Sequence, residues 1–524
     1  MDTKALRQKI LDLAIRGKLV PQDPNDEPAS VLLERIRQQK QQMVKEGKLK
    51  PKDIKNDSVI FLGEDNLHYE KFADGSVKCI EDEIPFDLPE GWAWARLNQI
   101  YNFIDYRGAT PNKISSGVPL ITAKNVKSGY IDYTIDEYIS EEEYWDRQQR
   151  GTSRLGDVLF TTEAPLGNAA IADIEKFSAG QRLITFQHYG SCVLNNHTFL
   201  YFILSDFFQD QLHTRKTGST VAGIKASILK TLLLPIPPIA EQDKIGEKCE
   251  NLLALIEEIT NSKQSIISAI PKTKAKILDL AIRGKLVPQD PNDEPASVLL
   301  ERIRAEKEEL IKQGKIKRDK KEFVIFRGED NSYYEKIGNK VQNISDEIPF
   351  ELPDGWMWCR GRSCFSGMES TKPQGEFFDY IDIDAIDNRL HRIKSAKHLP
   401  VPEAPSRASR AVKTGSVLFS LVRPYLENIA LVEEAHSHCI ASTGFYVCNS
   451  NGILLPKFMF LLMISSYVVS GLNQYMKGDN SPSISKDNIE SWLYPVPPLA
   501  EQKTICAKLK TVFTLIENVE KSLR

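Results

Sequence analysis

The sequence predicts an α+β protein in which two α/β domains are separated by long antiparallel coiled-coil helices, with pseudo-twofold, circular symmetry. Three observations predict this fold class. A stretch of the first half recurs in the second half, a proline-rich motif is followed twice by apolar residues at alternating three- and four-residue steps, and the segments between the repeats differ from each other. The length of 524 residues also favours several domains.

The composition is that of a globular protein, with 41% hydrophobic and 27% charged residues, so wholesale disorder and fibrous repeats are excluded. The longest apolar run, Phe458 to Val469, is shorter than the ~18 residues of a membrane span and predicts a buried helix. The N-terminal sequence is charged and has no signal-peptide core. The 8 cysteines are scattered without a CxxC pair, which indicates reduced thiols. We therefore expect a cytoplasmic protein that makes no contact with a membrane.

The net charge of −3 argues at first against a nucleic-acid binder, but charge is segregated along the chain. Residues 389–423 contain eight basic residues and one acid, whereas residues 57–90 contain ten acids and two basic residues. Such segregation allows a basic surface on an acidic protein. Solvated loops of either sign account for it equally well.

An internal repeat dominates the chain. Residues 9–37 recur letter for letter at 276–304, an offset of 267. Looser matches follow: GEDN at 63–66 and 328–331, DEIPF at 82–86 and 346–350, LPxGWxW at 88–94 and 352–358, and PxPPxAEQ at 235–242 and 495–502. Between these shared segments, which we call the frame, residues 97–230 and 361–490 share almost nothing, and we call them the two heads. Two unlike heads on one frame suggest two recognition domains in equivalent positions.

The frame is predicted to be helical after each PxPPxAEQ motif. Apolar residues recur on one stripe in both copies: Ile245, Cys249, Leu252, Ile256, Ile259, Ile266 and Ile270, then Ile505, Leu509, Val512, Ile516, Val519 and Leu523. This spacing is typical of a coiled-coil seam, and two seams in register offer each other a partner. A single amphipathic helix on a globular core is the alternative. Pro271 is expected to end or kink the first helix, whose 30 residues would span ~45 Å.

The frame also predicts the circular symmetry. The second seam stops at Arg524, in the position of Gln264, and the frame segment that would follow it is the one that begins at Lys9. Joined end to end, the two ends would rebuild the central frame. In the repeated VPQDPNDEPAS loop, Ser30 and Ser297 are predicted helix caps. The predicted domains are a helical frame segment with an acidic linker at 1–90, a first recognition domain at 91–239, a central frame at 240–354, a second recognition domain at 355–499 and a C-terminal coiled-coil helix at 500–524.

These motifs carry a resemblance to a known family. LPxGWxW before each head, PxPPxAEQ after it, the LAIRGKLVPQDPNDEPAS segment and the strands GDVLF (156–160) and GSVLF (415–419) resemble the target-recognition domains of the specificity subunit of type I restriction–modification systems. The resemblance covers nearly the whole chain and occurs in both halves. It depends on the order of the motifs rather than on any one of them.

The resemblance implies a sequence-specific DNA-binding subunit without catalysis of its own. The two heads would each read half of an asymmetric, interrupted site in double-stranded DNA. The frame would dock two adenine-N6 methyltransferase (modification) subunits and the restriction/translocase subunits. No cofactor is expected on this chain, because S-adenosylmethionine, ATP and Mg²⁺ would bind the partner subunits. Identical loops in the frame would dock identical partners, although a helical-hairpin connection is the structural alternative.

The lack of catalytic motifs in the sequence agrees with this implication. The sequence has no GxxxxGK[ST], GxGxxG, HExxH or GxSxG motif and no NPPY-like tetrapeptide for a flipped base. His436, His438, Cys439 and Cys448 are soft ligands in a short span, but their spacing does not match a structural zinc site. We interpret them as part of a buried strand pair and expect no metal.

DNA contacts require basic or polar side chains on loops. In each head an apolar helix (198–208 and 458–469) precedes a polar, glycine-bearing loop, although a helix cap and turn at Gly218 or Gly478 explain these loops equally well. The candidates in the first head are Arg107, Thr110, Asn112, Lys113, Lys124, Arg215, Lys216, Thr217, Ser219, Thr220 and Lys225. Those in the second head are Arg389, Arg392, Lys394, Arg423, Lys477, Asn480, Ser481 and Lys486. Any one of them is more typical of a phosphate or surface group than of a base reader.

Two other classes of function compete with DNA recognition. Residues 101–230 carry 13 basic and 14 acidic residues, and this near-neutral balance favours a symmetric protein–protein scaffold without nucleic-acid contact. An enzyme with its site in one head is the third class, and it lacks a motif.

Overall fold

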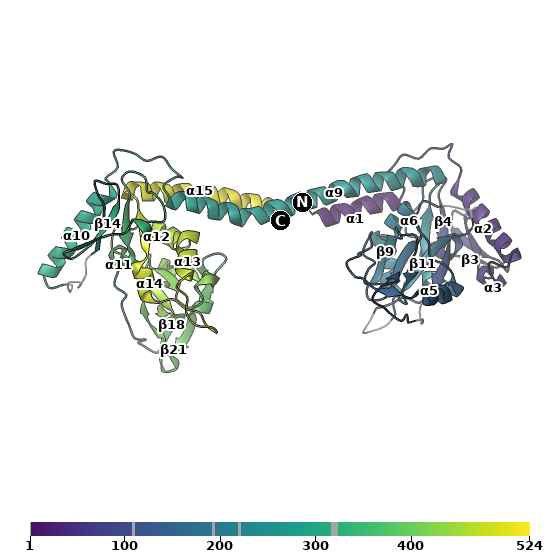
Figure 1. Ribbon diagram of the computed structural model, residues 1–524. Coiled ribbons are helices and arrows are strands. Elements are labelled where there is room, and N and C mark those ends of the chain that lie inside the picture. Colours follow the sequence, from purple (N-terminus) through teal and green to yellow (C-terminus); the bar gives the residue numbers. More distant parts are fainter. Residues whose placement is uncertain (1, 107–109, 191–193, 218–221, 316–322, 524) are drawn as a thin grey trace. The chain divides into compact units, whose positions relative to one another are not determined.

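The computed structural model describes residues 2–106, 110–190, 194–217, 222–315 and 323–523. The chain divides into two compact units, Met1–Lys263 and Gln264–Arg524 (Figure 1). Each unit contains frame helices, a small three-stranded sheet and one head. The order of these elements is the same in both units, as the repeat predicts.

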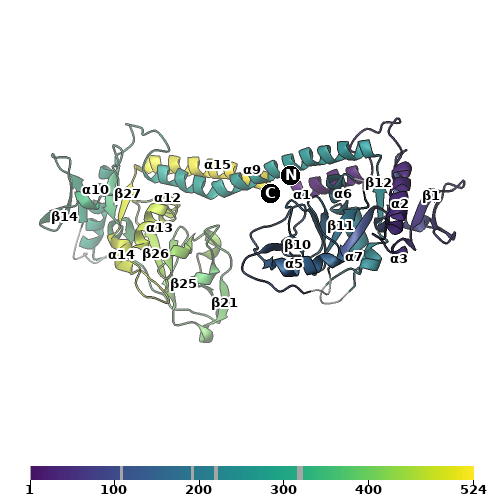
Figure 2. The same ribbon diagram turned by 45° about the vertical axis from the view of Figure 1, so that its right-hand side comes forward.

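The frame of the first unit is built from α1 (Thr3–Ile15), α2 (Ala29–Lys45) and the first part of α9 (Ile239–Ile282). Helix α1 lies along α9 in both views (Figures 1 and 2). The pair is antiparallel, because the segment after α1 returns Gln22 to Glu241 near the start of α9, with Nε2 3.1 Å from Oε1. Ile245 and Cys249 are fully buried in one cluster with Leu11 of α1. The partner of the first seam is thus α1, which corrects the expectation that the two seams pair with each other.

The segment after α2 enters the head. It contains α3 (Pro51–Ile54), the antiparallel strands β1 (Ser58–Leu62), β2 (His68–Phe72) and β3 (Val77–Cys79), and the short helix η1 (Glu81–Glu83). Strand β4 (Ala93–Arg96) then pairs antiparallel with β12 (Leu233–Ile236), which places Trp94 opposite Pro235. The two strands that flank the first head are therefore neighbours in one ladder.

The first head contains a four-stranded sheet in the order β5-β11-β8-β9 and a three-stranded sheet in the order β10-β6-β7. Its strands are β5 (Tyr101–Asp105), β6 (Val118–Ile121), β7 (Tyr138–Ile139), β8 (Val158–Thr162), β9 (Leu166–Ile171), β10 (Ser178–Ala179) and β11 (Leu183–His188). Its helices are α4 (Leu97–Ile100), α5 (Glu141–Arg147), η2 (Gln148–Arg150), α6 (Asn196–Ile203), α7 (Asp206–Thr214) and α8 (Ala226–Leu229).

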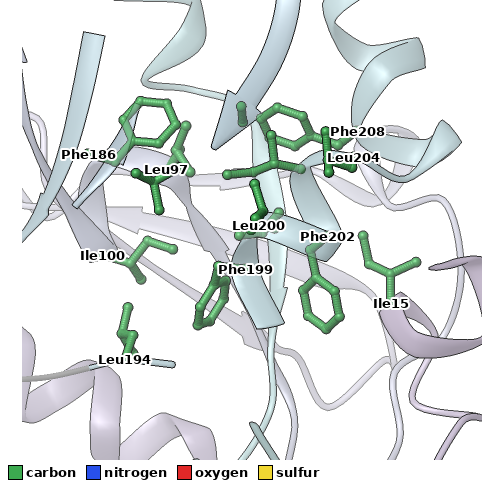
Figure 3. Packing of buried hydrophobic residues seen from close by; sticks show 14 of the residues in the cluster. Ile15, Leu97, Ile100, Phe186, Leu194, Phe199, Leu200, Phe202, Leu204 and Phe208 are labelled. Atoms are coloured by element: carbon green, nitrogen blue, oxygen red, sulfur yellow. The ribbon is translucent and has the colours of Figure 1, made fainter. Parts of the chain in front are cut away.

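Helix α6 joins this head to the frame. Phe199 and Phe202 are fully buried, and Ile15 of α1 lies beside Phe202 (Figure 3). The predicted single helix over 198–208 is two helices. The hydroxyl of Ser205 accepts from Phe208 N at 3.4 Å and starts α7, because a serine offers the backbone a capping bond that interrupts the apolar run. Ser465 caps Val468 N at 3.3 Å in the same way in the second unit, where 458–469 was expected to be one helix.

The second unit repeats this order. Its helices are the last part of α9, α10 (Ala296–Lys312), α11 (Gly361–Cys364), α12 (Pro456–Met463), α13 (Ser466–Asn473), α14 (Lys486–Ser491) and α15 (Leu499–Leu523), with short helices η3 (Ser345–Glu347), η4 (Ile383–Ala385), η5 (Val401–Glu403), η6 (Pro424–Leu426) and η7 (Glu434–His436). Its frame strands are β13 (Phe323–Arg327), β14 (Tyr333–Ile337), β15 (Lys340–Asn343), β16 (Met357–Arg360) and β27 (Leu493–Val496).

The second head holds two four-stranded sheets, β17-β26-β23-β24 and β21-β18-β25-β22, and the pair β19-β20. The strands are β17 (Phe365–Ser366), β18 (Phe377–Ile381), β19 (Ile386–Asp387), β20 (Arg392–Ile393), β21 (Lys397–Pro400), β22 (Ala408–Ala411), β23 (Val417–Ser420), β24 (Ile429–Leu431), β25 (Ile440–Ser442) and β26 (Phe445–Ser450). The predicted strands at GDVLF and GSVLF are confirmed as β8 and β23.

Pro271 does not end its helix, whereas the alternative expectation of a kink there stays a prediction, and the expected caps at Ser30 and Ser297 are wrong. Helix α9 continues through Pro271 to Ile282, since Ala281 and Ile282 beyond the proline are fully buried against the second unit's core and keep that turn in place. Ser30 and Ser297 are not caps: α2 and α10 start one residue earlier, after Pro28 and Pro295. The first helical N–H of α2 donates to Gly91 O at 2.8 Å, so a side-chain cap is not needed there.

Helix α15 packs along the last part of α9 in the second unit (Figures 1 and 2). Ile505 and Leu509 lie in one buried cluster with Leu278 of α9, and Lys274 Nζ is 3.6 Å from Glu517 Oε1. The segment after α9 returns Gln289 to Glu501 at 3.1 Å, so this pair is antiparallel too. Among the described residues, no helix combines the length and the apolar character that crossing a bilayer requires.

Candidate nucleic-acid interface

In the first head, the loop after α7 is fixed beside the end of β8. Thr217 N donates to Gly223 O at 2.8 Å and Gly223 N donates back to Thr217 O at 3.0 Å, which pairs these two residues. Gly223 also forms an antiparallel β-bridge with Glu163, the residue after β8. Ile224 N donates to Thr162 O at 3.0 Å. Thr217, Gly223 and Ile224 are therefore held beside the end of β8 by backbone bonds.

The second head has the same backbone bonds between a loop and the end of a strand, formed by a different sequence. We call this arrangement the loop assembly. Lys477 and Ser483 exchange two backbone bonds of 3.0 Å, and Ser483 bridges Val422 after β23. Ile484 N donates to Leu421 O at 2.9 Å. In both heads an exposed loop thus emerges next to the end of the equivalent strand.

Cationic and polar groups occupy these loops. Lys216, Lys225 and Lys477 are exposed and take part in no ion pair among the described residues. Asn480 and Ser481 are exposed as well, whereas Lys486 is paired with Glu490 at 3.2 Å. Arg215 is half-buried and is the C-cap residue of α7. Thr217 is the residue that exchanges backbone bonds with Gly223. Ser219 and Thr220 lie outside the described residues.

Arg423 has a positioning role. Its backbone is left-handed, with φ of 48°, its N–H donates to Pro482 O at 2.7 Å, and its Nη2 donates to Asn480 O at 3.0 Å. A left-handed backbone is uncommon for a residue with a side chain, so the surrounding contacts hold this turn in place. The guanidinium thereby fixes the loop 477–483 against the turn after β23.

The candidates on the strand pair β19-β20 lie against the same turn. Asn388 Nδ2 donates to Leu426 O at 2.8 Å, and His391 Nε2 lies 3.8 Å from Glu427 Oε2. Arg389, Arg392 and Lys394 are exposed on or next to these two strands. The structure therefore brings together the 389–394 segment, the turn after β23 and the loop 477–483.

The remaining first-head candidates separate into two groups. Thr110 Oγ1 donates to Gln181 Oε1 at 2.8 Å, and the next residue, Arg182, is 3.1 Å from Glu163, so Thr110 is linked to the loop assembly. Lys113 pairs with Glu137 at 2.7 Å instead. Arg107 lies outside the described residues.

Two further candidates lie in other surroundings. Asn112 N donates to the Glu143 carboxylate at 3.0 Å, beside a hollow that is also lined by Glu142 and Asp146. These acids would repel phosphate. Lys124 is exposed, and its carbonyl accepts from Lys127 Nζ at 2.7 Å, with no contact to the loop assembly among the described hydrogen bonds.

Sequence reasoning missed Gln181 and Arg182, which lie between β10 and β11. It also missed Asn388 and the exposed Tyr425, at 47% exposure. These residues belong to no motif, and only the strand order brings them to the loops. Arg182, a basic residue between two strands, is the one weak signal in the sequence for a DNA contact among these four residues.

The strand that carries the assembly starts at a buried side chain in each head. Asp157 Oδ2 accepts from Arg154 N and from Gln187 Nε2, each at 2.8 Å, and burial raises the pKa of this carboxyl to about 6. Ser416 Oγ accepts from Lys413 N at 3.0 Å and donates to Asn449 Oδ1 at 2.6 Å. The neutral hydroxyl makes the same type of turn contact without a charge.

Comparisons with known proteins agree with this picture. The model of the type I restriction modification DNA specificity domain matches residues 89–268 and 410–524. The chain is similar to the EcoAI specificity subunit of a type I restriction enzyme from Escherichia coli, at 27% identity over 97% of this chain and 88% of that protein. It is similar to the EcoEI specificity subunit from Escherichia coli at 27% identity over 99% of this chain and 91% of that protein. A chain from a solved structure on the assembly of a type I R-M system shares the fold, with a TM-score of 0.50 and 17% identity over 84% of this chain and 94% of that chain.

Proposed function

Because the chain belongs to the type I restriction modification DNA specificity domain family, we propose that it is the DNA-recognition subunit of a type I restriction–modification complex. Each head would bind one half of a bipartite, asymmetric site in double-stranded DNA. The chain itself is non-catalytic, and methyl transfer and restriction belong to other subunits.

The observation that carries this proposal is the recurrence of one loop assembly in two unlike heads. The backbone bonds Thr217–Gly223 and Lys477–Ser483 are equivalent, whereas the side chains around them differ. Backbone and basic groups position a protein on phosphates, and side chains that reach base edges set sequence. A common backbone with different side chains therefore suits two recognition surfaces of different specificity.

We assign partner docking to the frame. Residues 9–37 and 276–304 are identical, and within them Pro24, Glu27, Pro291 and Glu294 are exposed and not used to build the core. Identical exposed surfaces favour two copies of one partner, the adenine-N6 methyltransferase subunit. The restriction/translocase subunits would join this complex in the cytoplasm, with S-adenosylmethionine, ATP and Mg²⁺ bound to the partners.

A head exchange tests the proposal. Residues 97–230 are replaced by the corresponding head of another specificity subunit, and methylated adenines are mapped across the genome of cells that express the complex. We expect one half of the methylated site to change and the other half to stay. A change in both halves would contradict two independent heads.

The scaffold hypothesis is tested separately by gel shift on random DNA duplexes, with and without the co-expressed methyltransferase subunit. The proposal predicts retained DNA at least in the presence of the partner. If neither mixture retains DNA, the chain is a protein–protein scaffold.

A further inference from the structure

Four potential metal ligands lie on, or directly before, three neighbouring strands of the second head. Strand β18 pairs antiparallel with β21, which places Asp379 directly opposite His398. Strand β25 runs parallel to β18 on its other side, with Ile440 opposite Tyr380, so His438 and Cys439 arrive just before β25 begins. Strand register thus gathers side chains that are far apart in the sequence.

The other three side chains gather around the carboxylate of Asp379. His398 Nδ1 lies 2.9 Å from Asp379 Oδ1, and His438 Nε2 lies 2.7 Å from Asp379 Oδ2. The Cys439 Sγ atom is 4.0 Å from His438 Nε2, and the ligand atoms of Asp379, His438 and Cys439 lie within 4.8 Å of one another. The imidazole of His398 stacks on Phe377, with ring centroids 5.0 Å apart, which orients its Nδ1.

We propose that Asp379, His398, His438 and Cys439 form a binding site for one divalent transition-metal ion, with Zn²⁺ as the best match. Thiolate, imidazole and carboxylate are the three ligand types that proteins use for zinc, and four of them complete a tetrahedral shell. Zinc bonds of about 2.0–2.3 Å at tetrahedral angles separate ligand atoms by about 3.3–3.8 Å. Asp379, His438 and Cys439 already lie within 4.8 Å of one another, whereas His398, whose Nδ1 contacts Asp379 Oδ1 at 2.9 Å, would have to move toward the other two ligands to complete the shell.

The burial of the four groups suits a structural site at the surface. Cys439 is buried at 4% exposure and forms the floor, while the side chains of His398 and His438 are 66% and 61% exposed. An ion can therefore enter from solvent, and its binding would displace the proton of the Cys439 thiol. Once bound, it would link β21, β18 and β25 at one end of their sheet.

The first head shows that the fold does not need these residues. Its strands β7, β6 and β10 have the same pairing as β21, β18 and β25, with Pro119 opposite Tyr138 and Leu120 opposite Ser178. By this register the four equivalent positions hold Pro119, Tyr138, Lys176 and Phe177. No zinc ligand occurs among these four described residues, so the cluster is specific to the second head.

The site differs from the group His436, His438, Cys439 and Cys448, for which the sequence led us to expect no metal. Cys448 is fully buried on β26 in the main core of the second unit and belongs to a different sheet. Asp379 and His398 replace it, and neither could be grouped with Cys439 before the strand order was known.

The test uses Co²⁺ as a spectroscopic probe of the full chain, after chelation and dialysis. We expect one equivalent of Co²⁺ to bind, with the visible bands of a tetrahedral ion and a near-ultraviolet thiolate-to-cobalt charge-transfer band, and Zn²⁺ to displace it. Cys439→Ser should abolish the charge-transfer band. The matched control Cys79→Ser removes an exposed cysteine of the first unit and should leave the band unchanged.

A second variant separates metal binding from folding. His398→Gln removes an exposed ring and should lower Zn²⁺ affinity at least about tenfold while the circular dichroism spectrum stays the same. Zn²⁺ should also raise the unfolding temperature of the wild type and not that of His398→Gln. The proposal is overturned if the wild type shows no charge-transfer band, or if that band survives Cys439→Ser.

Discussion

The indole Nε1 of Trp92 donates to Glu241 Oε2 at 2.9 Å, and this buried bond joins the motif before the first head to the motif after it. The other carboxylate oxygen of Glu241 accepts from Gln22 Nε2 at 3.1 Å. Trp356 repeats the bond to Glu501 at 2.7 Å in the second unit. One glutamate in each unit therefore holds the repeated loop, the entry and the exit of the head together.

Replacing Trp92 by phenylalanine tests this bond. The change leaves a buried carboxylate oxygen of Glu241 without its donor, so we expect the free energy of unfolding of the first unit to fall by about 1–3 kcal/mol. Thermal and urea unfolding followed by circular dichroism measure the loss. Trp145→Phe, at a tryptophan with 64% exposure, is the control and should have little effect. Equal stability of the two variants would show that the bond contributes nothing.

The carboxyl of Asp157 predicts a pH dependence of the first unit. Its pKa is raised by burial from 3.8 to about 6, so the folded state binds the proton more tightly than the unfolded state. Stability should then fall as the pH rises from about 4 to about 6, by about 2–3 kcal/mol, and stay level above.

Asp157→Asn should remove this fall and make the protein more stable than the wild type at pH 7. Unfolding temperatures measured from pH 4 to pH 8 check the prediction, with the exposed Asp136→Asn as the control. Ser416 shows that a neutral side chain can close the equivalent turn. An unchanged pH profile in Asp157→Asn would assign the dependence to another group.

Lys216→Ala should weaken the binding of the complex to all DNA sequences by a similar factor. The side chain is exposed on the loop after α7, where a single charge suits a phosphate. Binding isotherms at several salt concentrations should show a salt slope reduced by about 1. Lys71→Ala on β2 is the control for loss of one surface charge. A loss that is confined to sequences differing at one base would make Lys216 a base reader.

Arg423→Gly tests the positioning of the second loop. Glycine adopts the left-handed backbone of this residue without strain, so the turn should survive while the hydrogen bond to Asn480 O is lost. We expect faster amide hydrogen exchange at 477–483. Arg389→Ala removes a nearby exposed guanidinium and should leave that exchange unchanged. Unchanged protection in Arg423→Gly would show that the backbone bonds alone hold the loop.

An insertion of four residues after Asn261 tests whether α9 sets the distance between the proposed half-sites. The insertion adds about one helical turn, or ~6 Å, so the unread spacer should lengthen by one or two base pairs. Methylome mapping gives the spacer directly. An unaltered spacer would exclude α9 as the element that sets it.

The frame could be predicted from the sequence because its signals are local or internal. An identical repeat needs no structural knowledge to be recognised, and the apolar seam before Ile256 depends only on helical spacing. The partner of that seam could not be predicted, since the seams are similar to each other and α1 offers an equally apolar face.

The expectations about the helix ends were wrong where a group far away in the sequence decides where a helix begins or ends. The Gly91 carbonyl, far along the chain, satisfies the start of α2 and makes Ser30 unnecessary as a cap. Burial of Ile282 outweighs the helix-breaking tendency of Pro271. Within the candidate interface, the loops were predicted by their glycines and lysines, whereas Arg182 and Asn388 required the strand order.

The pairing of β4 with β12 has an evolutionary consequence. Trp94 and Pro235 are paired in one ladder, and both belong to motifs that recur around the second head. A genetic exchange of everything between the two motifs would keep this ladder, which holds the two flanks of the head together. New sequence preferences could thus arise in a single genetic event, without the slow accumulation of point mutations.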